Sequence, residues 1–514
     1  MRGKSNNNLR RLLENRAKER SDKTFLFSEA DGRSWTYAEF DKAVNRAANM
    51  FTENGIKKGD VVSLLMPNSA EYVIAYFACF KIGALAGPIN SLLKPEEIAF
   101  ALNDSEAKML LFNSQFQTDI DKIRHDLPHL QNIIQFDNVA GVTKNFSEKL
   151  DGISIKKEDE AIIIYTSGTT GKPKGCLLTH ENLIANARQI TEWLGFDEND
   201  RLLTIMPLFH MNAVSVTTMT ALYAGGSTVV CPKFSASRFW KIVSDYKITS
   251  FGSVATMLSM LLAVNSQTEN PALSTQHSAL STLRFAMCGS APVPAEVLKK
   301  FEETFDCLVI EGYGLSESTC RSTFNPPDKN RRPGSCGKAM GNEMKVFNEN
   351  DREVPDGELG EIVLRGENIF KGYFKNEEAT KKAFRNGWFH TGDIGYKDAD
   401  GFFYIIDRKS DMIIRGGENI YPREIDELLY THPAVETAAV IGVPDELYGE
   451  EVTAFVVLKE DEKVCEEDLI NFCKKHLADY KCPKSIHFVA DIPKGATGKL
   501  LKRELAQLYK SVKS

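Results

Sequence analysis

The stretch Tyr165-Thr166-Ser167-Gly168-Thr169-Thr170-Gly171-Lys172-Pro173-Lys174-Gly175 directly follows the apolar run Ala161-Ile162-Ile163-Ile164. The run is rich in β-branched residues, which predicts a buried strand that leads into the glycine-rich segment. Glycines allow close backbone approach, so that N–H groups, hydroxyls and lysine ammonium groups can surround phosphate oxygens. This chemistry predicts a binding loop for a triphosphate.

The loop is not a Walker loop. That pattern requires Ser or Thr after its Gly-Lys pair, and here Gly171-Lys172 is followed by Pro173. A solvent-exposed Gly/Ser/Thr loop is the alternative interpretation. The combination of glycines, hydroxyls and lysines directly after a predicted strand favours phosphate binding.

Helical and strand patterns alternate along the first part of the chain. Thr36 and Glu39 have the spacing of a capping box, which predicts the start of a helix. Residues 61–66 form a predicted buried strand, and residues 71–82 a predicted packed helix. Short β-rich runs recur at 227–231 and 308–310 in the middle of the chain. The alternation predicts an α/β fold with layers around a largely parallel sheet.

The pattern changes towards the C-terminus. From about Gly357, alternating strands at 361–365 and 401–406 predict a β-rich subdomain. The charged stretch 407–411 follows and has the composition of a hinge. We therefore predict a large N-terminal domain at 1–407 and a small α+β domain at 408–514.

Composition excludes several classes of protein. The chain has 514 residues, 42% hydrophobic and 26% charged, which indicates a globular protein of at least two domains. Its net charge of -7 gives no electrostatic reason to expect nucleic-acid binding. The ten cysteines show no C-x-x-C spacing, and residues 1–20 lack the apolar core of a signal peptide. No run approaches the ~20 apolar residues of a spanning helix, so we expect a cytoplasmic protein without a transmembrane segment.

The loop at 165–175 resembles the signature loop of the adenylate-forming superfamily, which includes acyl-CoA synthetases, luciferases and peptide-synthetase adenylation domains. The resemblance covers nearly the whole chain, in the family's order. Its other motifs are Pro207-Leu208-Phe209-His210, Gly312-Tyr313-Gly314-Leu315-Ser316-Glu317, Gly357-Glu358-Leu359-Gly360-Glu361-Ile362, Thr391-Gly392-Asp393, Asp407-Arg408, Arg415-Gly416-Gly417-Glu418-Asn419 and Pro493-Lys494-Gly495-Ala496-Thr497-Gly498-Lys499.

The resemblance implies a two-step ligase that uses ATP, Mg²⁺ and coenzyme A. A carboxylate attacks the α-phosphate of ATP to give acyl-AMP and pyrophosphate, and a thiol then converts acyl-AMP into a thioester and AMP. Both steps need charge stabilisation more than covalent help from the protein. The implied fold is a large multi-layered N-terminal domain with α/β sheets and a β-rich subdomain, followed by a small α+β lid.

The resemblance also assigns roles to individual residues. Lys499 would stabilise charge on the α-phosphate, and Glu317 and Thr166 would hold Mg²⁺. His210 and Asn212 would lie beside the acyl group. Taken alone, Lys499 would read as a solvated lysine and His210 as a structural histidine.

A larger set of positions matches the family's cofactor-binding residues. Tyr313 would stack on adenine, Asp393 in a tight Thr-Gly-Asp turn would bind the ribose hydroxyls, and Arg408 would contact ribose or phosphate. Gly416 and Gly417 resemble the glycines of the pantetheine tunnel, although a plain turn is the alternative. The full set is Thr166, Ser167, Gly168, Thr169, Thr170, Gly171, Lys172, Lys174, Gly289, Ser290, Ala291, Glu311, Gly312, Tyr313, Gly314, Ser316, Asp393, Ile405, Arg408, Gly416 and Gly417.

The family rotates its small domain between the two steps, because Lys499 must leave before the thiol enters. The matching hinge position is Ser410, where the family usually has Lys or Asp. Serine tolerates the dihedral change, but contacts made by a charged hinge residue in one state would be missing.

The acid and the thiol are less closely specified. We rank a fatty or short- to medium-chain acid first and crotonobetaine or carnitine second, because Asn212 offers a trimethylammonium group neither charge nor an aromatic face. A stand-alone enzyme that loads a carrier protein is an alternative, but no acidic residue occurs at 208–216 to bind an amino acid and no carrier domain follows Lys499. A luciferase-like monooxygenase and a non-catalytic binding protein are further alternatives, and a homodimer is possible.

Overall fold

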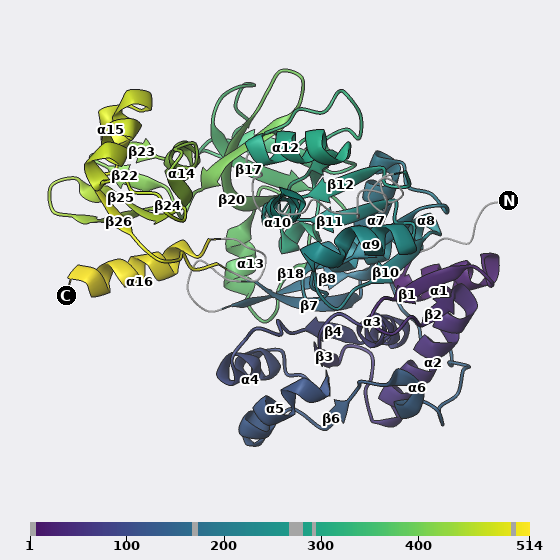
Figure 1. Cartoon of the computed structure of the whole chain (residues 1–514). Coiled ribbons are helices and arrows are strands. Elements are labelled where there is room, and N and C mark those ends of the chain that lie inside the picture. The colour runs from purple at the N-terminus through teal and green to yellow at the C-terminus, as the bar shows by residue number, and fades with distance from the viewer. Residues whose placement is uncertain (1–6, 167–172, 267–280, 290–294, 495–499, 514) are drawn as a thin grey trace. The chain divides into compact units, whose positions relative to one another are not determined.

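The computed structural model describes residues 7–166, 173–266, 281–289, 295–494 and 500–513 (Figure 1). The chain forms two compact units, and each is described by itself. The first contains Met1–Met344 and Leu364–Phe389, and the second contains Lys345–Val363 and His390–Ser514. The second unit includes residues 408–514, whereas the predicted boundary at 407/408 and the hinge at Ser410 stay predictions.

Among its described residues, the first unit contains two large sheets. The first has the order β13-β12-β11-β9-β10-β1-β2, and its pairs are parallel except for β1 with β2. Its strands are β1 (Thr24–Ser28), β2 (Ser34–Thr36), β9 (Arg201–Thr204), β10 (Ser227–Val230), β11 (Ser250–Ser253), β12 (Phe285–Cys288) and β13 (Leu308–Glu311).

The second sheet has the order β18-β8-β7-β4-β3-β5-β6. Its strands are β3 (Val61–Leu65), β4 (Leu85–Pro88), β5 (Met109–Phe112), β6 (Asn132–Gln135), β7 (Glu160–Thr166), β8 (Lys174–Thr179) and β18 (Gly372–Tyr373). Strands β3 to β7 pair in parallel, and β8 and β18 are antiparallel additions at one edge. The same unit contains a two-stranded ribbon of β14 (Thr323–Phe324) and β15 (Lys338–Ala339).

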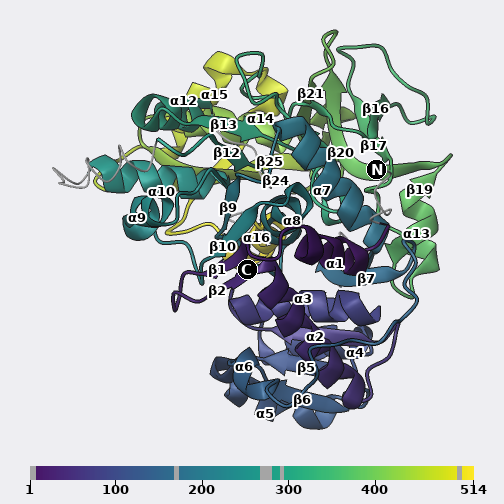
Figure 2. The same ribbon diagram turned by 90° about the vertical axis from the view of Figure 1, so that its right-hand side faces the viewer.

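Local signals explain why the N-terminal helices form where they do. Thr36 accepts a hydrogen bond from the Glu39 N–H (3.2 Å) and Glu39 accepts one from the Thr36 N–H (2.8 Å), which confirms the predicted capping box of α2 (Tyr37–Glu53). Helix α3 (Ala70–Ile82) is buried on every side, as its continuous apolar sequence predicts. Helices α1 (Leu9–Glu19), α2 and α3 lie side by side (Figure 2).

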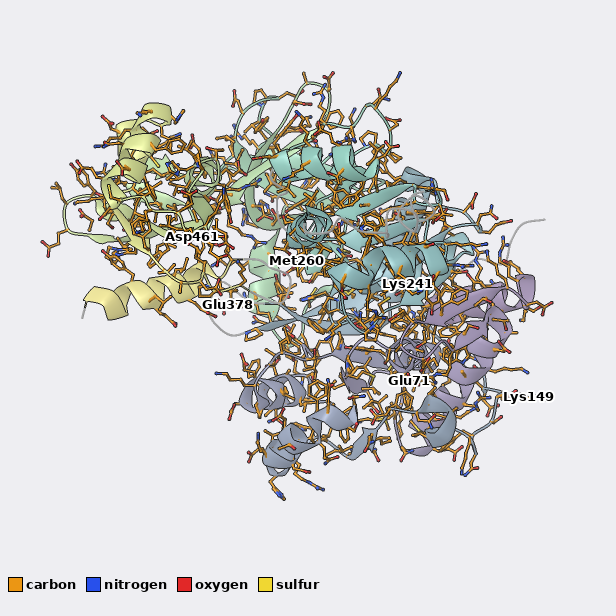
Figure 3. All side chains as sticks on the ribbon, in the orientation of Figure 1. Glu71, Lys149, Lys241, Met260, Glu378 and Asp461 are labelled. Carbon is orange, nitrogen blue, oxygen red and sulfur yellow. The ribbon has the colours of Figure 1, made fainter. Side chains whose placement is uncertain are left out.

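The charged residues inside this helical layer are paired. Glu71 of α3, labelled in Figure 3, accepts a hydrogen bond of 2.8 Å from Arg33. Lys81 at the other end of α3 is buried and lies 2.5 Å from the carboxylate of Asp41. Such pairing is what permits charges to be buried in a packed core.

The remaining helices of the first unit cover its sheets or connect their strands. They are α4 (Pro95–Asp104), α5 (Gln117–Ile123), α6 (Val139–Val142), α7 (His180–Leu194), α8 (Thr220–Ala224), α9 (Ala236–Asp245), α10 (Ala255–Ser266), α12 (Ala295–Phe305) and α13 (Glu377–Ala383), with the π-helix η3 (Asn212–Met219) and the 3₁₀ turn η4 (Ser316–Ser318).

The second unit has its own sheet and core. The sheet has the order β23-β22-β25-β24, with β26 on β25. Its apolar core includes Ile413, Ile425, Val440, Ala454 and Leu469. The elements are β22 (Ile413–Arg415), β23 (Glu418–Ile420), α14 (Pro422–Tyr430), β24 (Val435–Asp445), β25 (Gly449–Leu458), α15 (Glu466–His476), β26 (Ser485–Phe488) and α16 (Lys502–Lys513). The predicted α/β class with a small α+β C-terminal part is confirmed.

A further sheet uses strands from the later part of the chain, in the order β16-β17-β20-β19 with β21 on β20. These strands are β16 (Glu343–Phe347), β17 (Gly360–Arg365), β19 (Phe384–Arg385), β20 (Trp388–Lys397) and β21 (Phe403–Arg408). β17 confirms the strand predicted at 361–365, and β21 begins and ends two residues later than the strand predicted at 401–406. None of the helices among the described residues is long and apolar enough to cross a membrane.

Candidate active site

The predicted phosphate loop joins two antiparallel strands. Thr166 ends β7 and pairs with Lys174 at the start of β8, so the two strands hold the ends of the loop next to each other. Both side chains are partly exposed. The predicted binding residues Ser167, Gly168, Thr169, Thr170, Gly171 and Lys172 lie outside the described residues.

The segment 312–316 follows β13 and is held close to the neighbouring strand. The Gly312 N–H donates to the Cys288 carbonyl (2.9 Å) at the end of β12, and a Cβ on Gly289 would lie 2.6 Å from the Gly312 carbonyl oxygen. A Cβ on Gly314 would overlap with the Cys320 carbonyl oxygen. Glycine is therefore required at these positions by close backbone approach.

Those glycines fix the positions of the neighbouring predicted residues. Tyr313 is partly exposed, and its N–H donates to the Thr323 carbonyl at 3.3 Å. Glu311, at the end of β13, is buried and accepts a hydrogen bond from the Gly334 N–H at 3.0 Å. Ser316 begins η4. Ser290 and Ala291 lie outside the described residues.

Glu317 lies in η4, directly beyond this segment, and is held at both its backbone and its side chain. Its carbonyl accepts from the Phe370 N–H (2.8 Å), and its Oε1 accepts from the Tyr373 hydroxyl (2.9 Å). Burial and the nearby Glu317 carboxylate raise the pKa of the Cys176 thiol in β8 well above its usual range. Glu317 therefore lies beside the β8 end of the sheet.

Tyr373 connects Glu317 to the hairpin. It pairs with Cys176 where β18 joins β8, and the Lys174 ammonium lies 5.3 Å from the centre of its ring. Contacts thus run from Thr166 through Lys174 and Tyr373 to Glu317. Oε2 of Glu317 has no hydrogen-bond partner among the described residues. The Glu317 carboxylate and the Thr166 hydroxyl are oxygen ligands of the kind that Mg²⁺ prefers.

The two residues predicted beside the acyl group are polar, and Asn212 is buried whereas His210 is partly buried. Burial lowers the pKa of His210 to about 4, so its imidazole is neutral at pH 7. Its Nε2 atom and both polar side-chain atoms of Asn212 are buried without a hydrogen-bond partner among the described residues. Asn212 begins the π-helix η3, and such helices are frequent at functional sites.

The prediction of a tight turn at Thr391-Gly392-Asp393 is wrong. All three residues lie inside β20, where Asp393 pairs with Arg408 of β21. The Asp393 carboxylate is buried and accepts from the Arg408 side chain at 2.7 Å, so the two predicted residues form an ion pair. The glycine suggested a turn, but the ladder to β21 tolerates the positive φ of Gly392 (72°).

The other predicted residues of the second unit lie in β21 and in a tight turn. Ile405 is a partly buried residue of β21, and its carbonyl accepts from Arg423 (2.6 Å). Gly416 and Gly417 join β22 to β23, with φ of 60° and 92°. Positive φ at both residues is the signature of a two-residue hairpin turn that favours glycine. Lys499 lies outside the described residues.

Sequence reasoning missed two residues that the fold brings to this region. Tyr373 belongs to no motif quoted above, and only the pairing of β18 with β8 places it beside Glu317. Arg321 is buried four residues beyond Glu317, with its guanidinium 5.5 Å from the centre of the Phe324 ring. The charged residue in Thr319-Cys320-Arg321-Ser322 was the available signal, but sequence alone does not show its burial.

Two family models match the chain. The model described as AMP-binding enzyme matches residues 13–374, and that described as AMP-binding enzyme C-terminal domain matches residues 424–499. Together they match parts of both units of the structure.

Curated relatives match over nearly their whole length. The chain is 36% identical to the oxalate–CoA ligase of Arabidopsis thaliana (97% of this chain, 98% of the relative). It is also 36% identical to the long-chain-fatty-acid–CoA ligase FadD13 of Mycobacterium tuberculosis (92% and 93%). Identity to the crotonobetaine/carnitine–CoA ligase of Salmonella arizonae is 34% (97% and 98%).

A solved structure shows the same fold. The crystal structure of ATP-bound MatB from Rhodopseudomonas palustris superposes with a TM-score of 0.91 at 31% identity, over 99% of this chain and 100% of that chain.

The glycine requirement at 314 is testable. Gly314→Ala places a methyl group against the Cys320 carbonyl, so we expect the melting temperature to fall by roughly 5 °C. Gly152→Ala is the matched control, because a Cβ there meets nothing within 4 Å. Calorimetry of both variants is the measurement, and equal melting temperatures would contradict the close approach.

Proposed function

This chain belongs to the family of AMP-binding enzymes and is an acid:CoA ligase, and we propose that it works in two half-reactions on one site. In the first, a carboxylate attacks the α-phosphate of ATP and pyrophosphate leaves. In the second, the thiol of CoA attacks the acyl carbonyl and AMP leaves. The observation that carries this proposal is the cluster of Glu317, Tyr373 and Lys174 at the ends of the phosphate-loop strands.

The residues of the first unit would bind and orient ATP. Lys174 and the loop between β7 and β8 would neutralise the phosphates. Tyr313 would stack on adenine, because its backbone is fixed at the end of β13. Glu317 and Thr166 would hold Mg²⁺, which supplies positive charge against the phosphates when bound.

Tyr373 would keep Glu317 in the orientation that this role needs. Its hydroxyl occupies Oε1, which leaves Oε2 for the cation.

Residues predicted in the second unit keep their proposed roles. Lys499 would place an ammonium against the charge that develops on the α-phosphate. The Asp393–Arg408 ion pair changes how these two residues would act, because Arg408 would orient the carboxylate that accepts hydrogen bonds from the ribose hydroxyls. Rotation at Ser410, a homodimer and a cytoplasmic location stay predictions.

The acid is proposed to be of short or medium chain. The buried polar atoms of His210 and Asn212 would have no hydrogen-bond partner if a long apolar acyl tail lay against them, and this would cost free energy on binding. The names of the relatives include long-chain fatty acids, oxalate and crotonobetaine. Because their sequence identities to this chain are all similar, the relatives do not indicate which of these acids is the substrate. A cationic acid is disfavoured, because Arg321 already places a buried positive charge in the same unit.

The test of the whole proposal is a panel of carboxylic acids with ATP and CoA. We expect pyrophosphate, AMP and acyl-CoA to form in equal amounts with at least one acid. ATP–pyrophosphate exchange without CoA measures the first half-reaction alone. Formation of ADP and phosphate in place of AMP and pyrophosphate would contradict the proposed chemistry.

The role of Tyr373 has a specific test. Tyr373→Phe removes the hydrogen bond to Glu317 and keeps the ring beneath Lys174, so we expect kcat/KM for Mg·ATP to fall about tenfold. The loss should shrink at high Mg²⁺. Tyr246→Phe, which alters a ring packed on Phe27, is the control and should change nothing. A Mg²⁺-independent loss would count against a role in positioning Glu317.

Lys499→Ala should lower the rate of acyl-AMP formation by about 10²- to 10³-fold, because one transition-state contact is lost. Thioester formation from supplied acyl-AMP should stay near the wild-type rate. Lys494→Ala is the matched control, since the Lys494 side chain is exposed and its one ion pair to a described residue is that with Asp491, at 4.0 Å. Equal losses in both half-reactions would exclude a role confined to the first step.

Gly417→Leu should slow thioester formation and spare ATP–pyrophosphate exchange, because the side chain would fill the proposed thiol path. The substitution also strains a residue with φ of 92°, so the control is Gly401→Leu. Gly401 has φ of 84° and, like Gly417, has nothing within 4 Å of an added Cβ. If the two variants lose CoA turnover equally, strain explains the effect and the tunnel assignment fails.

A further inference from the structure

Arg321 is the largest fully buried side chain in the described structure, with 1% of its surface exposed. Its Nε and Nη2 atoms are buried and have no hydrogen-bond partner among the described residues. No ion pair involving Arg321 occurs in that part of the chain either. A guanidinium cannot lose its charge at ordinary pH, so burial without a partner is costly and calls for an anion.

The neighbouring groups do not provide that anion. Glu311 is the nearby carboxylate, but no ion pair links it to Arg321 within the described ranges, and its Oε2 accepts from the Gly334 N–H (3.0 Å). Burial raises the pKa of the Cys288 thiol to about 12, so this thiol stays neutral. The Phe324 ring, 5.5 Å from the guanidinium carbon, offers the cation an aromatic face but no hydrogen-bond acceptor in line with its N–H groups.

Two glycines make room for Arg321 and Asn212. A Cβ on Gly289 would lie 2.5 Å from Nη2 of Arg321, and a Cβ on Gly252 would lie 2.7 Å from Oδ1 of Asn212. Gly252 pairs in register with Met287 across parallel strands, and Gly289 is two residues beyond Met287. Residues two apart on a strand face the same side of the sheet, and residues paired across parallel strands do so too. Gly252 and Gly289 therefore lie on the same face of the sheet.

A hydrogen-bonded chain links the backbone of Arg321 to the helix that begins at Asn212. Asn186 of α7 donates to the Arg321 carbonyl (2.6 Å) and accepts from the Arg321 N–H (3.3 Å). The same asparagine accepts a hydrogen bond from Ser215 of η3 at 2.8 Å, and Ser215 lies one turn beyond Asn212. Asn186 is thus a common buried partner of the Arg321 backbone and of η3, the helix that begins at Asn212.

We propose that Arg321, assisted by the amide of Asn212, binds a second anionic group on the acid substrate, a carboxylate or a sulfonate at the end remote from the reacting carboxylate. This inference rests on the proposed function and narrows its substrate to short acids with two negative charges. A planar guanidinium binds a carboxylate through two parallel hydrogen bonds, which also orients the acid. A site built for that group rejects an analogue that lacks it, because the buried donors would stay unpaired.

The experiment compares dicarboxylates with monocarboxylates of equal carbon number, from two to five carbons, in pyrophosphate release with ATP and CoA. 3-Sulfopropionate, set against succinate, distinguishes a sulfonate from a carboxylate. For the wild-type enzyme we expect kcat/KM to be at least about 100-fold higher for the best dianionic acid than for its monoacid. Arg321→Met should remove this preference, mainly by raising KM for the dianionic acid, and should leave KM for ATP unchanged. Arg321→Lys should restore part of it.

Arg201→Met is the matched control. Arg201 also has a buried, unpartnered Nε and lies over an aromatic ring, 4.6 Å from the centre of Phe27. Arg201 is at the N-terminal end of β9. Arg321 lies against Gly289, which follows the C-terminal end of β12. Because β9, β11 and β12 are parallel, the two arginines lie at opposite ends of the strands of one sheet. This variant should keep the wild-type preference between the acids.

The outcomes separate this inference from the proposed function. If the wild-type enzyme makes acyl-CoA from monoacids in preference to every dianionic acid, the inference is overturned and the proposed function stands. If Arg321→Met lowers kcat/KM equally for both kinds of acid, Arg321 has a structural or phosphate-binding role and the inference fails. If no acid gives acyl-CoA, both fail. The wild-type comparison decides the matter even when Arg321→Met does not fold.

Discussion

The close approach of backbone to backbone at the ends of β12 and β13 is the constraint on which the site depends. Gly289, Gly312 and Gly314 lie where any side chain would meet a neighbouring carbonyl, guanidinium or ring. That approach brings the segment after β13 across the end of β12, so that Tyr313, Glu317 and Arg321 follow one another along the same edge. A bulkier residue would displace all three together, because their positions share this one contact.

The edge brings together two parts of the chain that are distant in sequence. The β7–β8 hairpin carries Thr166 and Lys174, and β18 adds Tyr373 to its outer strand. The Tyr373–Glu317 hydrogen bond then joins the hairpin to the segment after β13. Because the contact is polar and partly exposed, it adds little to stability, of order 1 kcal/mol. Its consequence is orientation: it engages Oε1 of Glu317 and leaves Oε2 for the proposed cation.

Sequence patterns predicted this fold well where the signal is local. The capping box at Thr36, the buried strand at 61–65 and the helix at 70–82 are all set by neighbours within a few residues. Asp393 shows the opposite case, since a Thr-Gly-Asp sequence reads as a turn and only the pairing of β20 with β21 makes it a strand. The hydrogen bond between Glu317 and Tyr373 could not be predicted from local sequence either, because Tyr373 is 56 residues away and is brought to Glu317 by sheet pairing.

Arg321 shows why burial changes the meaning of a residue type. From the sequence, an arginine in a polar stretch is interpreted as a solvated side chain. A solvated charge has no desolvation cost and gives no indication of a ligand. The same guanidinium under a packed sheet face must be compensated, since an unpaired buried charge costs several kcal/mol. His210 and Asn212, in the same unit, add three more buried polar atoms without partners among the described residues. An apolar acyl tail would leave these groups unpaired, whereas a short acid with a second anionic group would pair with the guanidinium. The polarity of the buried residues, rather than the family motifs, would therefore distinguish among the acids that have been proposed as substrates.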